Sequence, residues 1–394
     1  MPRVVGSALA GLGLVLLLGW ASLAGLRSKA GLLEEERAPQ PSRPGTLRAL
    51  LTVPQEPSPA EGPPSPPPPP PSVRGGVFWS RALEAQVPRG FSRASSAAWL
   101  RAARGSRVLS LERGGCGRSS NRLALLSDGS RACVRYGINP EQILGEALSY
   151  HLAGLLGIQE RLPPLALSRV GARQWALVGE ELRGSPWAEG AVVSLARWVE
   201  NLTEVVAPAP WRASGAPLLP GLGPGALAGL GRAQLVELVQ WSDLILFDYL
   251  TGNFDRLASN LFSLQWDPRV MHRATRNLLR GPDGGLVFLD NEAGLLHGYR
   301  LLSAWEPYHE PLLRSLCLFR QDTARALRAL HRRRDAARQL RARYRAHEPL
   351  APSLGFLSPE QGRLLQERVD RVHRHILHCR AGARAKQTGQ GDAL

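Results

Sequence analysis

Apolar residues recur at short intervals in the first part of the chain. Residues 107–112, 122–126 and 132–136 are short stretches in which apolar residues alternate or cluster, and glycine-rich turns separate them. Such spacing predicts a meander of antiparallel strands. Residues 141–156 then carry apolar residues at the spacing of an α-helix. The first part of the fold is therefore predicted to be a small β-rich lobe with one helix.

Helical spacing dominates the second part. Residues 233–250 predict a strongly apolar helix, and residues 285–289 predict a short buried strand. Residues 207–231, rich in Gly, Pro and Ala, predict a long surface loop. Leucines and arginines alternate at helical spacing in residues 323–347, which predicts one amphipathic helix whose basic face is solvated or docks an acidic partner or lipid headgroups. The predicted fold class is α+β, with a β-rich N-terminal lobe and a larger helical C-terminal lobe.

The N-terminal region has a different character. Residues 4–26 are uncharged and mostly apolar, enough to cross a ~30 Å hydrocarbon core as a helix. A cleaved signal peptide has a shorter apolar region of roughly 7–15 residues, so we expect residues 1–26 to be an uncleaved signal-anchor with a short cytoplasmic end. Residues 27–90, with prolines throughout 66–71, predict a disordered, extended stem. Residues 91–394 are then the catalytic domain.

Cysteine usage and one glycosylation triplet indicate the compartment. The four cysteines show no CxxC or Cys/His metal spacing, which favours disulfides in an oxidising environment. Three connectivities are open, and we expect Cys116–Cys133 with Cys317–Cys379 because these pairs close the shorter loops. Asn201 begins an Asn-Leu-Thr acceptor triplet, which is usable when the body faces the lumen. These features predict a glycosylated type II membrane protein with a luminal body.

The charge is strongly positive and comes almost wholly from arginine. The formal net charge is +16, and Lys29 and Lys386 are the only lysines in the sequence. A basic chain can bind nucleic acid, but no DNA- or RNA-binding signature accompanies the charge, so we expect no nucleic-acid partner. Any mechanism that needs a lysine within residues 30–385 is excluded.

The candidate chemistry lies at the end of the apolar helix and after the buried strand. Asp255 and Asn260 share one polar turn, and Asp290 follows the strand about 30 residues later. Phosphoryl transfer requires an aspartate that orients or deprotonates the attacking hydroxyl, together with oxygen ligands for the metal ions on the phosphates. Mg²⁺ and Mn²⁺ both accept carboxylate and amide oxygens. The three residues could supply these groups.

Two motifs resemble those of a known family. The segments Gly-Asn-Phe-Asp-Arg at 252–256 and Leu-Asp-Asn-Glu at 289–292 are similar to the catalytic and metal motifs of the atypical Golgi kinases of the secretory pathway. The resemblance runs from about residue 107 to the C-terminus. It implies a two-lobed, protein-kinase-like fold that uses ATP with Mn²⁺ or Mg²⁺. It also implies Asp255 as the catalytic aspartate, Asp290 as the metal-binding aspartate and Asn260 as a metal-loop residue.

The nucleotide side of the site departs from that family in one residue. Glu146 falls where the family has its helix glutamate, but the position of the family's strand lysine is occupied by Arg135. Arginine keeps the charge and can bind phosphate with two hydrogen bonds, although it is not interchangeable with lysine. Gly115 and Gly117 lie in a glycine-rich turn that could bring backbone amides to the phosphates or could be a plain hairpin turn.

The resemblance implies a luminal Golgi kinase, anchored or released by cleavage. Its substrates would be serine or threonine residues in extracellular cadherin domains of the Fat and Dachsous type, with roles in cadherin binding, planar polarity and growth. Two alternatives stay open. A secreted or anchored pseudokinase or ligand would account for the missing lysine. A Golgi glycosyltransferase would share the anchor and stem, although the Asp-x-Asp motif of many such enzymes is absent from the sequence.

Overall fold

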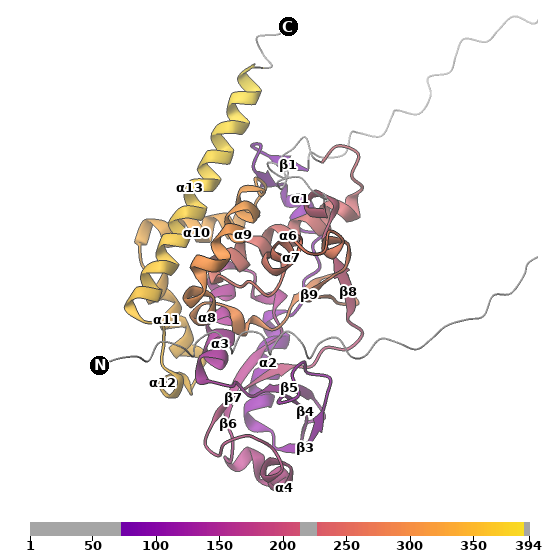
Figure 1. The fold of residues 1–394 in the computed structure, drawn as a ribbon, viewed down its shortest axis with the longest axis vertical. Coiled ribbons are helices and arrows are strands. Elements are labelled where there is room, and N and C mark those ends of the chain that lie inside the picture. Colours follow the sequence, from indigo (N-terminus) through magenta and orange to yellow (C-terminus); the bar gives the residue numbers. More distant parts are fainter. Residues whose placement is uncertain (1–71, 213–226, 390–394) are drawn as a thin grey trace, which may run out of the picture. The chain divides into compact units, whose positions relative to one another are not determined.

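The computed structural model describes residues 72–212 and 227–389. The predicted anchor and residues 27–71 of the predicted stem lie outside these residues. Within the described ranges, none of the helices combines the length and apolar character that a membrane span requires. The described residues form the predicted α+β arrangement, in which a lobe built around a β-sheet is followed by a helical lobe (Figure 1).

The small lobe is a five-stranded antiparallel sheet in the order β3-β4-β5-β7-β6. Its strands are β3 (Val108–Arg113), β4 (Arg122–Leu126), β5 (Arg131–Arg135), β6 (Leu165–Arg169) and β7 (Val192–Arg197). Buried and half-buried positions alternate along β4, as expected for a strand whose two faces meet different surroundings. The predicted meander is confirmed.

Helix α3 (Pro140–Leu156) joins β5 to β6 and corresponds to the predicted helix at 141–156. Its start is specified locally, because the Asn139 side chain caps the first turn and Pro140 occupies a position that needs no donor. Gly157 ends it in the left-handed region. Most of its residues are buried, and α3 packs against the helical lobe as well as the sheet.

The helical lobe is built around α6 (Arg232–Thr251), whose second half is completely enclosed. After it come α7 (Leu257–Ser263) and the hairpin of β9 (Ala274–Arg280) and β10 (Leu286–Phe288). Strand β8 (Thr203–Val206) adds to this hairpin, so that a second sheet has the order β10-β9-β8. The helix predicted at 233–250 and the buried strand predicted at 285–289 are confirmed.

The C-terminal helices correct one prediction. The segment predicted as a single helix at 323–347 is two helices, α10 (Gln321–Arg333) and α11 (Ala336–His347). Arg334 ends α10 with a φ of 50°. The break lets both helices pack against α3 and α13 (Pro359–Gly389), which a straight helix of that length could not do.

A second correction concerns the end of the stem. Folding begins at β1 (Val73–Arg74) and β2 (Phe78–Trp79), so the predicted boundary at residue 90 is too late. Trp79 is completely buried, its Nε1–H donates to Ser242 Oγ at 3.2 Å, and its backbone N–H donates to Phe319 O at 3.1 Å. The polar and glycine-rich composition of this stretch did not indicate that Trp79 packs into the helical lobe.

The predicted loop at 207–231 also contains structure at its start. Helix α5 (Ala209–Arg212) buries Trp211 against the helical lobe, while residues 213–226 lie outside the described ranges. The remaining elements are α1 (Arg81–Glu84), α2 (Arg93–Gly105), α4 (Gly179–Arg183), α8 (Leu296–Arg300), α9 (Leu302–Arg314), α12 (Ala351–Leu354), and the short 3₁₀ turns η1 (Gln159–Arg161), η2 (Arg173–Val178), η4 (Val270–His272) and η5 (Asn291–Ala293).

All four cysteines form disulfides in the structure, with the pairing that the shorter loops favour. Cys116 bonds to Cys133, and Cys317 bonds to Cys379. The first disulfide ties the glycine-rich turn between β3 and β4 to strand β5. The second ties α13 to the segment after α9. Both bonds fit an oxidising, secretory environment.

Candidate active site

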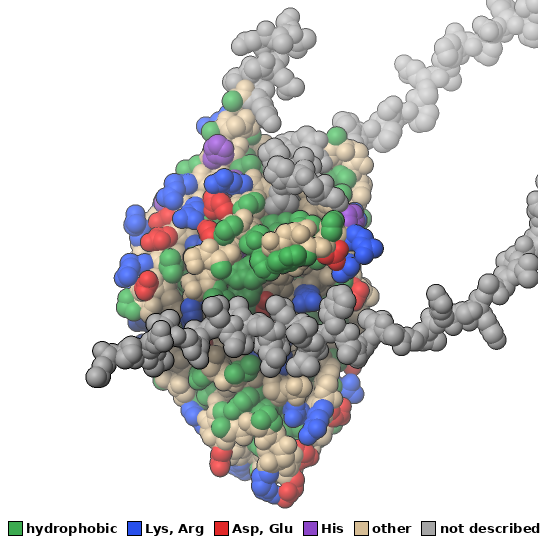
Figure 2. Space-filling view, in the orientation of Figure 1, with side chains coloured by type: hydrophobic (Ala, Val, Ile, Leu, Met, Phe, Trp, Pro, Cys, Tyr) green, Lys and Arg blue, Asp and Glu red, His purple; other side chains and the backbone are tan. Residues whose placement is uncertain are grey.

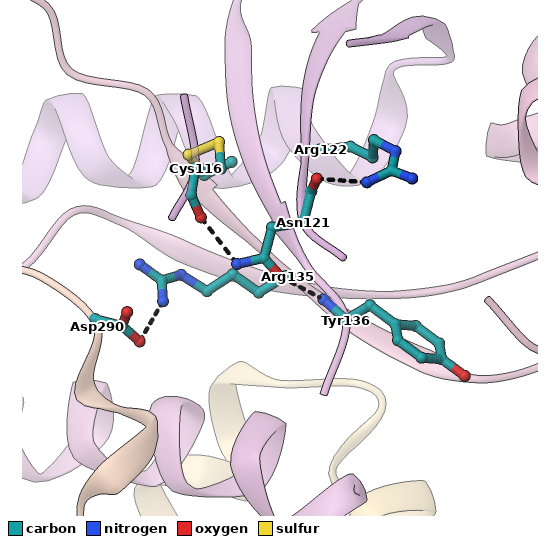
Figure 3. The surroundings of a disulfide bond; sticks show 7 residues. Cys116, Asn121, Arg122, Arg135, Tyr136 and Asp290 are labelled. Atoms are coloured by element: carbon teal, nitrogen blue, oxygen red, sulfur yellow. Dashed lines mark hydrogen bonds and ion pairs between the residues drawn. A yellow bond between two sulfur atoms is a disulfide. The ribbon is translucent and has the colours of Figure 1, made fainter. Parts of the chain in front are cut away.

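The centre of the candidate site is an ion pair between the two lobes. Arg135, the last residue of β5, extends toward Asp290, which follows β10, and its Nη1–H donates to Asp290 Oδ1 (Figure 3). Asp290 adopts the left-handed region with a φ of 53°, which is uncommon for a non-glycine residue. This backbone conformation turns the chain from the buried strand into η5. The residues predicted for phosphate and metal binding therefore meet.

Helix α3 brings Glu146 to the same place. A Cβ atom at Gly145 would lie only 2.9 Å from the carbonyl oxygens of Glu292 and Gly294, so the glycine permits a close approach of α3 to η5. The carboxylate of Glu146 accepts a hydrogen bond from the backbone N–H of Asn291. A small pocket between the lobes is lined by Arg135, Glu146, Tyr150, Phe288 and Asp290.

Charges in this pocket stabilise one another. Burial by itself lowers the pKa of Arg135, but the carboxylates of Glu146 and Asp290 outweigh it and raise that pKa above its ordinary value. Burial raises the pKa of Glu146, and the positive charge of Arg135 opposes that shift. Arg135 is thus held as a cation by two acidic side chains.

The loop after α6 presents Asp255 at the edge of this charged group. Helix α6 ends at Gly252 in the left-handed region, and Asn253 Oδ1 then accepts the backbone N–H of Asp255 at 3.0 Å. This turn holds Asp255 with its side chain partly exposed. Burial raises the pKa of Asp255, and the negative charge of Asp290 raises it further. The two predicted aspartates are close enough to repel each other.

Sequence reasoning missed Arg256, a buried arginine that joins the loop after α6 to the turn after β10. Arg256 has no exposed surface, its Nη2–H donates to Asn291 Oδ1, and its Nη1 lies 3.4 Å from Asp248 Oδ1. Burial raises the pKa of Asp248 to about 7 despite the positive charge of Arg256. An Asp-Arg pair after a helix commonly marks a surface contact, so only the fold shows that Arg256 joins the loop that carries Asp255 to the turn that follows Asp290.

Asn260 lies one helical turn beyond Arg256, in α7. It is buried, its backbone N–H donates to Arg256 O at 3.2 Å, and its Nδ2 has no partner within the described residues. Carboxylates that repel each other, such as those of Asp255 and Asp290, suit a divalent cation, and Asn260 can add an amide oxygen. The residues present therefore fit Mg²⁺ or Mn²⁺, while the share of Asn260 in that site stays a prediction.

The glycine-rich turn closes over the site from the small lobe. Gly115 and Gly117 have positive φ values of 77° and 83°, and Gly115 faces the ring of Trp198. Asn121 Nδ2–H donates to Cys116 O at 2.8 Å within this turn (Figure 3).

Across the cleft, Arg118 from the same turn forms an ion pair with Glu292. Glu292 is thereby engaged by the small lobe, and Arg118 is a contact that the sequence pattern did not predict. Phosphate binding by the turn stays a prediction.

Next to Asp255, aromatic side chains gather on the surface of the helical lobe. Phe254 stacks on Trp305 with ring centroids 4.6 Å apart, and Phe262 contacts both Trp266 and Tyr308. Trp266 is 67% exposed. Figure 2 shows hydrophobic side chains gathered in the region where Figure 1 draws α7 and α9. We call these five residues the aromatic surface.

Asn201 lies away from these side chains, between β7 and β8. It is exposed and has a φ of 56°, a conformation that asparagine tolerates better than most residues. Exposure is compatible with glycosylation, which stays a prediction.

Comparison with known proteins identifies a family model and several proteins that are similar to this chain. The model of the four-jointed box protein middle domain matches residues 94–382. Human four-jointed box protein 1 is 62% identical over 354 residues, which cover 85% of this chain and 80% of the human protein. The Drosophila melanogaster extracellular serine/threonine protein kinase four-jointed is 35% identical over 356 residues, which cover 77% of this chain and 60% of that protein.

Two solved structures are more distant. The Golgi casein kinase with Mn/ADP bound is 12% identical, with a TM-score of 0.47 over 75% of this chain and 80% of that chain. Hydra Fam20 with sugar is 16% identical, with a TM-score of 0.49 over 76% of this chain and 94% of that chain. The extent of the family match and the identity to its members are decisive: the chain belongs to the four-jointed box protein family.

Proposed function

We propose that this protein is a secretory-pathway kinase that transfers the γ-phosphoryl group of ATP to serine or threonine residues of extracellular cadherin domains. The observation that carries the proposal is the meeting of Arg135, Glu146 and Asp290 between the lobes, with Asp255 beside them. These groups come from β5, α3, the end of β10 and the loop after α6. Family membership, with a Drosophila relative named as an extracellular serine/threonine kinase, supports the same reaction.

Each side chain has a role that its surroundings support. Asp255 accepts the proton of the acceptor hydroxyl, and its raised pKa brings its basicity closer to that task. Asp290 and Asn260 would hold Mg²⁺ or Mn²⁺, which neutralises charge on the phosphates when bound. Arg135 binds the nucleotide phosphates through its guanidinium, and Glu146 keeps that group charged and oriented.

The missing lysine is the main argument for the pseudokinase alternative. Arg135 answers it in part, because the buried carboxylate of Glu146 and the partly exposed one of Asp290 hold it as they would hold a functional phosphate-binding cation. A site that had lost phosphoryl transfer would have no need to retain Asp255 with a raised pKa next to Asp290. We therefore favour an active enzyme in which arginine replaces lysine.

The aromatic surface supports a folded protein as the acceptor. It adjoins Asp255 through Phe254 and leaves Trp266 mostly exposed. Aromatic side chains are enriched at protein interfaces because they bury a large apolar area with little loss of side-chain freedom. The two disulfides fit acceptors of the secretory pathway. A Golgi membrane location through an N-terminal anchor, cleavage to a secreted form, glycosylation at Asn201, and control of cadherin binding, planar polarity and growth belong to the same proposal.

The test uses the full chain, ATP, Mn²⁺ or Mg²⁺, and a pair of cadherin repeats, with mass spectrometry of the acceptor. We expect phosphate on serine or threonine with the wild-type protein and none with Asp255→Asn. Nucleotide binding without transfer to any secreted domain would favour the pseudokinase, and sugar transfer from a nucleotide sugar would favour the glycosyltransferase.

A further inference from the structure

A second pocket, with several basic residues in its lining, lies beside the C-terminal half of α3. It has a volume of about 400 Å³ and is enclosed by α2, the C-terminal half of α3, and α11. This volume falls in the range of about 300–1,000 Å³ that is usual for small-molecule sites. Its polar and charged lining includes Arg93, Arg104, Tyr150, His151, Arg343 and His347.

Arg343 is the central cation of this pocket. Its Nη2–H donates to Gln159 Oε1 at 2.8 Å, a neutral partner, and its buried Nε has no partner. The guanidinium lies against Gly154, where a Cβ atom would overlap it. Among residues 72–212 and 227–389, no carboxylate forms an ion pair with Arg343. Burial lowers its pKa, and the charge of Arg93 lowers it further.

His151 forms the buried wall beside it. The imidazole is only 3% exposed, and neither ring nitrogen has a hydrogen-bond partner within the described part of the chain. Burial lowers the pKa of His151 to about 3, and the charges of Arg343, His347 and Arg104 add to the shift. Buried polar atoms without partners are costly, and a neutral imidazole carries one N–H group, so the N–H of His151 lacks an acceptor within the described residues.

Two carboxylates lie near the pocket, but they leave most of its positive charge unbalanced. Glu348 is engaged by Arg104, whose Nη2 lies 3.2 Å from Glu348 Oε2 and also donates to His347 O. Glu160 lines the pocket, but it forms no ion pair with Arg93 or Arg343. Within residues 72–212 and 227–389, neither of these two arginines is paired with an acid.

We propose that this pocket binds a small oxyanion of the phosphate type, with half-buried Arg343 and buried His151 as its donors and Arg93 at its rim. A phosphate oxygen accepts hydrogen bonds from guanidinium and imidazole N–H groups, and such charge-assisted bonds are stronger than neutral ones. Tyr150 and His151 follow Glu146 by about one turn of α3, so this pocket and the candidate active site share one helix. The proposal does not depend on phosphoryl transfer.

The experiment is calorimetric titration of inorganic phosphate into the full chain at constant ionic strength. We expect saturable binding that Arg343→Met weakens at least tenfold and that Arg93→Met weakens less. The matched control is Arg345→Met, an exposed arginine on the same helix, which should leave binding unchanged. Arg93 is exposed, so its variant keeps the proposal testable if the loss of Arg343 prevents folding.

A further variant separates this pocket from the cleft. Arg135→Met removes the cation of the candidate active site, so phosphate bound in the cleft is lost, whereas the binding that depends on Arg343 should remain. Loss of binding in Arg135→Met with retention in Arg343→Met would place the anion in the cleft and overturn the proposal. The absence of saturable phosphate binding would overturn it as well. Tighter binding of a phosphoserine peptide than of free phosphate would overturn the assignment to a small anion.

Discussion

Arg135 and Arg343 both lie next to α3 but differ in the charges that surround them. Arg135 faces Glu146 and Asp290, which raise its pKa although it is almost fully buried. Arg343 is less buried, yet burial lowers its pKa, Tyr150 only partly opposes that shift, and the charge of Arg93 lowers the pKa further, while its hydrogen-bond partner Gln159 is neutral. The comparison shows that paired carboxylates, not depth, decide whether a buried guanidinium is stable as a cation. The comparison also distinguishes Arg135, whose charge is compensated by protein carboxylates, from Arg343, which has space beside it for an external anion.

The largest expected effect comes from removing a compensating carboxylate in the cleft. Asp290→Ala should lower phosphoryl transfer by at least about 10²-fold, because it removes the metal-binding carboxylate and the partner of Arg135. Radiolabelled transfer from ATP to a cadherin repeat measures it. The control is Asp283→Ala, at the turn of the same β9-β10 hairpin, with thermal melting of both variants. Unchanged transfer in Asp290→Ala would refute the metal assignment.

The next effect concerns Arg135 itself. Arg135→Met should weaken ATP binding about tenfold or more, because a hydrogen bond to a charged group contributes about 1.5–3 kcal/mol. Arg135→Lys keeps the charge and should fall between the wild type and Arg135→Met. Calorimetric titration of ATP measures the series, with Arg131→Met on the same strand as the control. Equal affinity in all variants would mean that β5 does not contact the nucleotide.

Asp248 tests whether the positive charge of one arginine, Arg256, is enough to keep a buried carboxylate ionised. Burial raises its pKa from 3.8 to about 7 even beside Arg256. Between about pH 4 and pH 7 the native state then binds a proton that the unfolded state has released, so the free energy of unfolding falls as pH rises through this window. The slope contributed is at most about 1.4 kcal/mol per pH unit.

Asp248→Asn should remove that slope, and urea unfolding across the window measures it. The same slope in the variant and the wild type would show that Asp248 is ionised throughout.

The smallest expected effect comes from supplying Arg343 with the carboxylate it lacks. Ala97 is exposed on α2 and lines the basic pocket. Ala97→Glu should raise the free energy of unfolding by about 0.5 kcal/mol, as for a partly exposed ion pair, and should abolish phosphate binding. Ala98→Glu, the neighbouring exposed position outside the pocket lining, is the control. Equal phosphate affinity in Ala97→Glu and Ala98→Glu would contradict the conclusion that Arg343, unlike Arg135, lacks a paired carboxylate.

Much of the fold was predictable because its periodicity is strong and its ends are locally specified. The strand at 122–126 matches β4 at both ends, and the helix at 233–250 matches α6 to within one residue at each end. The break at Arg334 was not predictable, since arginine and leucine spacing continues through it. The folding of the segment around Trp79 was also hidden, because its partners Ser242 and Phe319 are far away in sequence.

The candidate site, like the fold, contains residues that the sequence predicted and residues that only the structure revealed. Asp255, Asp290 and Glu146 were predicted from motif order, spacing and the family resemblance, and the structure brings them close together, while their roles stay predictions. Arg256 and Arg118 were missed because their roles depend on Asn291 and Glu292, which other elements supply.

By itself the sequence determined which chemical groups are available: an arginine-rich body without lysine between residues 30 and 385, and aspartates at the ends of a helix and a strand. Only the tertiary structure decided which arginines are neutralised. Arg135 meets Asp290 across 155 positions, whereas Arg343 meets a neutral glutamine 184 positions away. The reason is physical, because the energy of a buried charge depends on neighbours in space, and one sequence pattern is compatible with either set of neighbours.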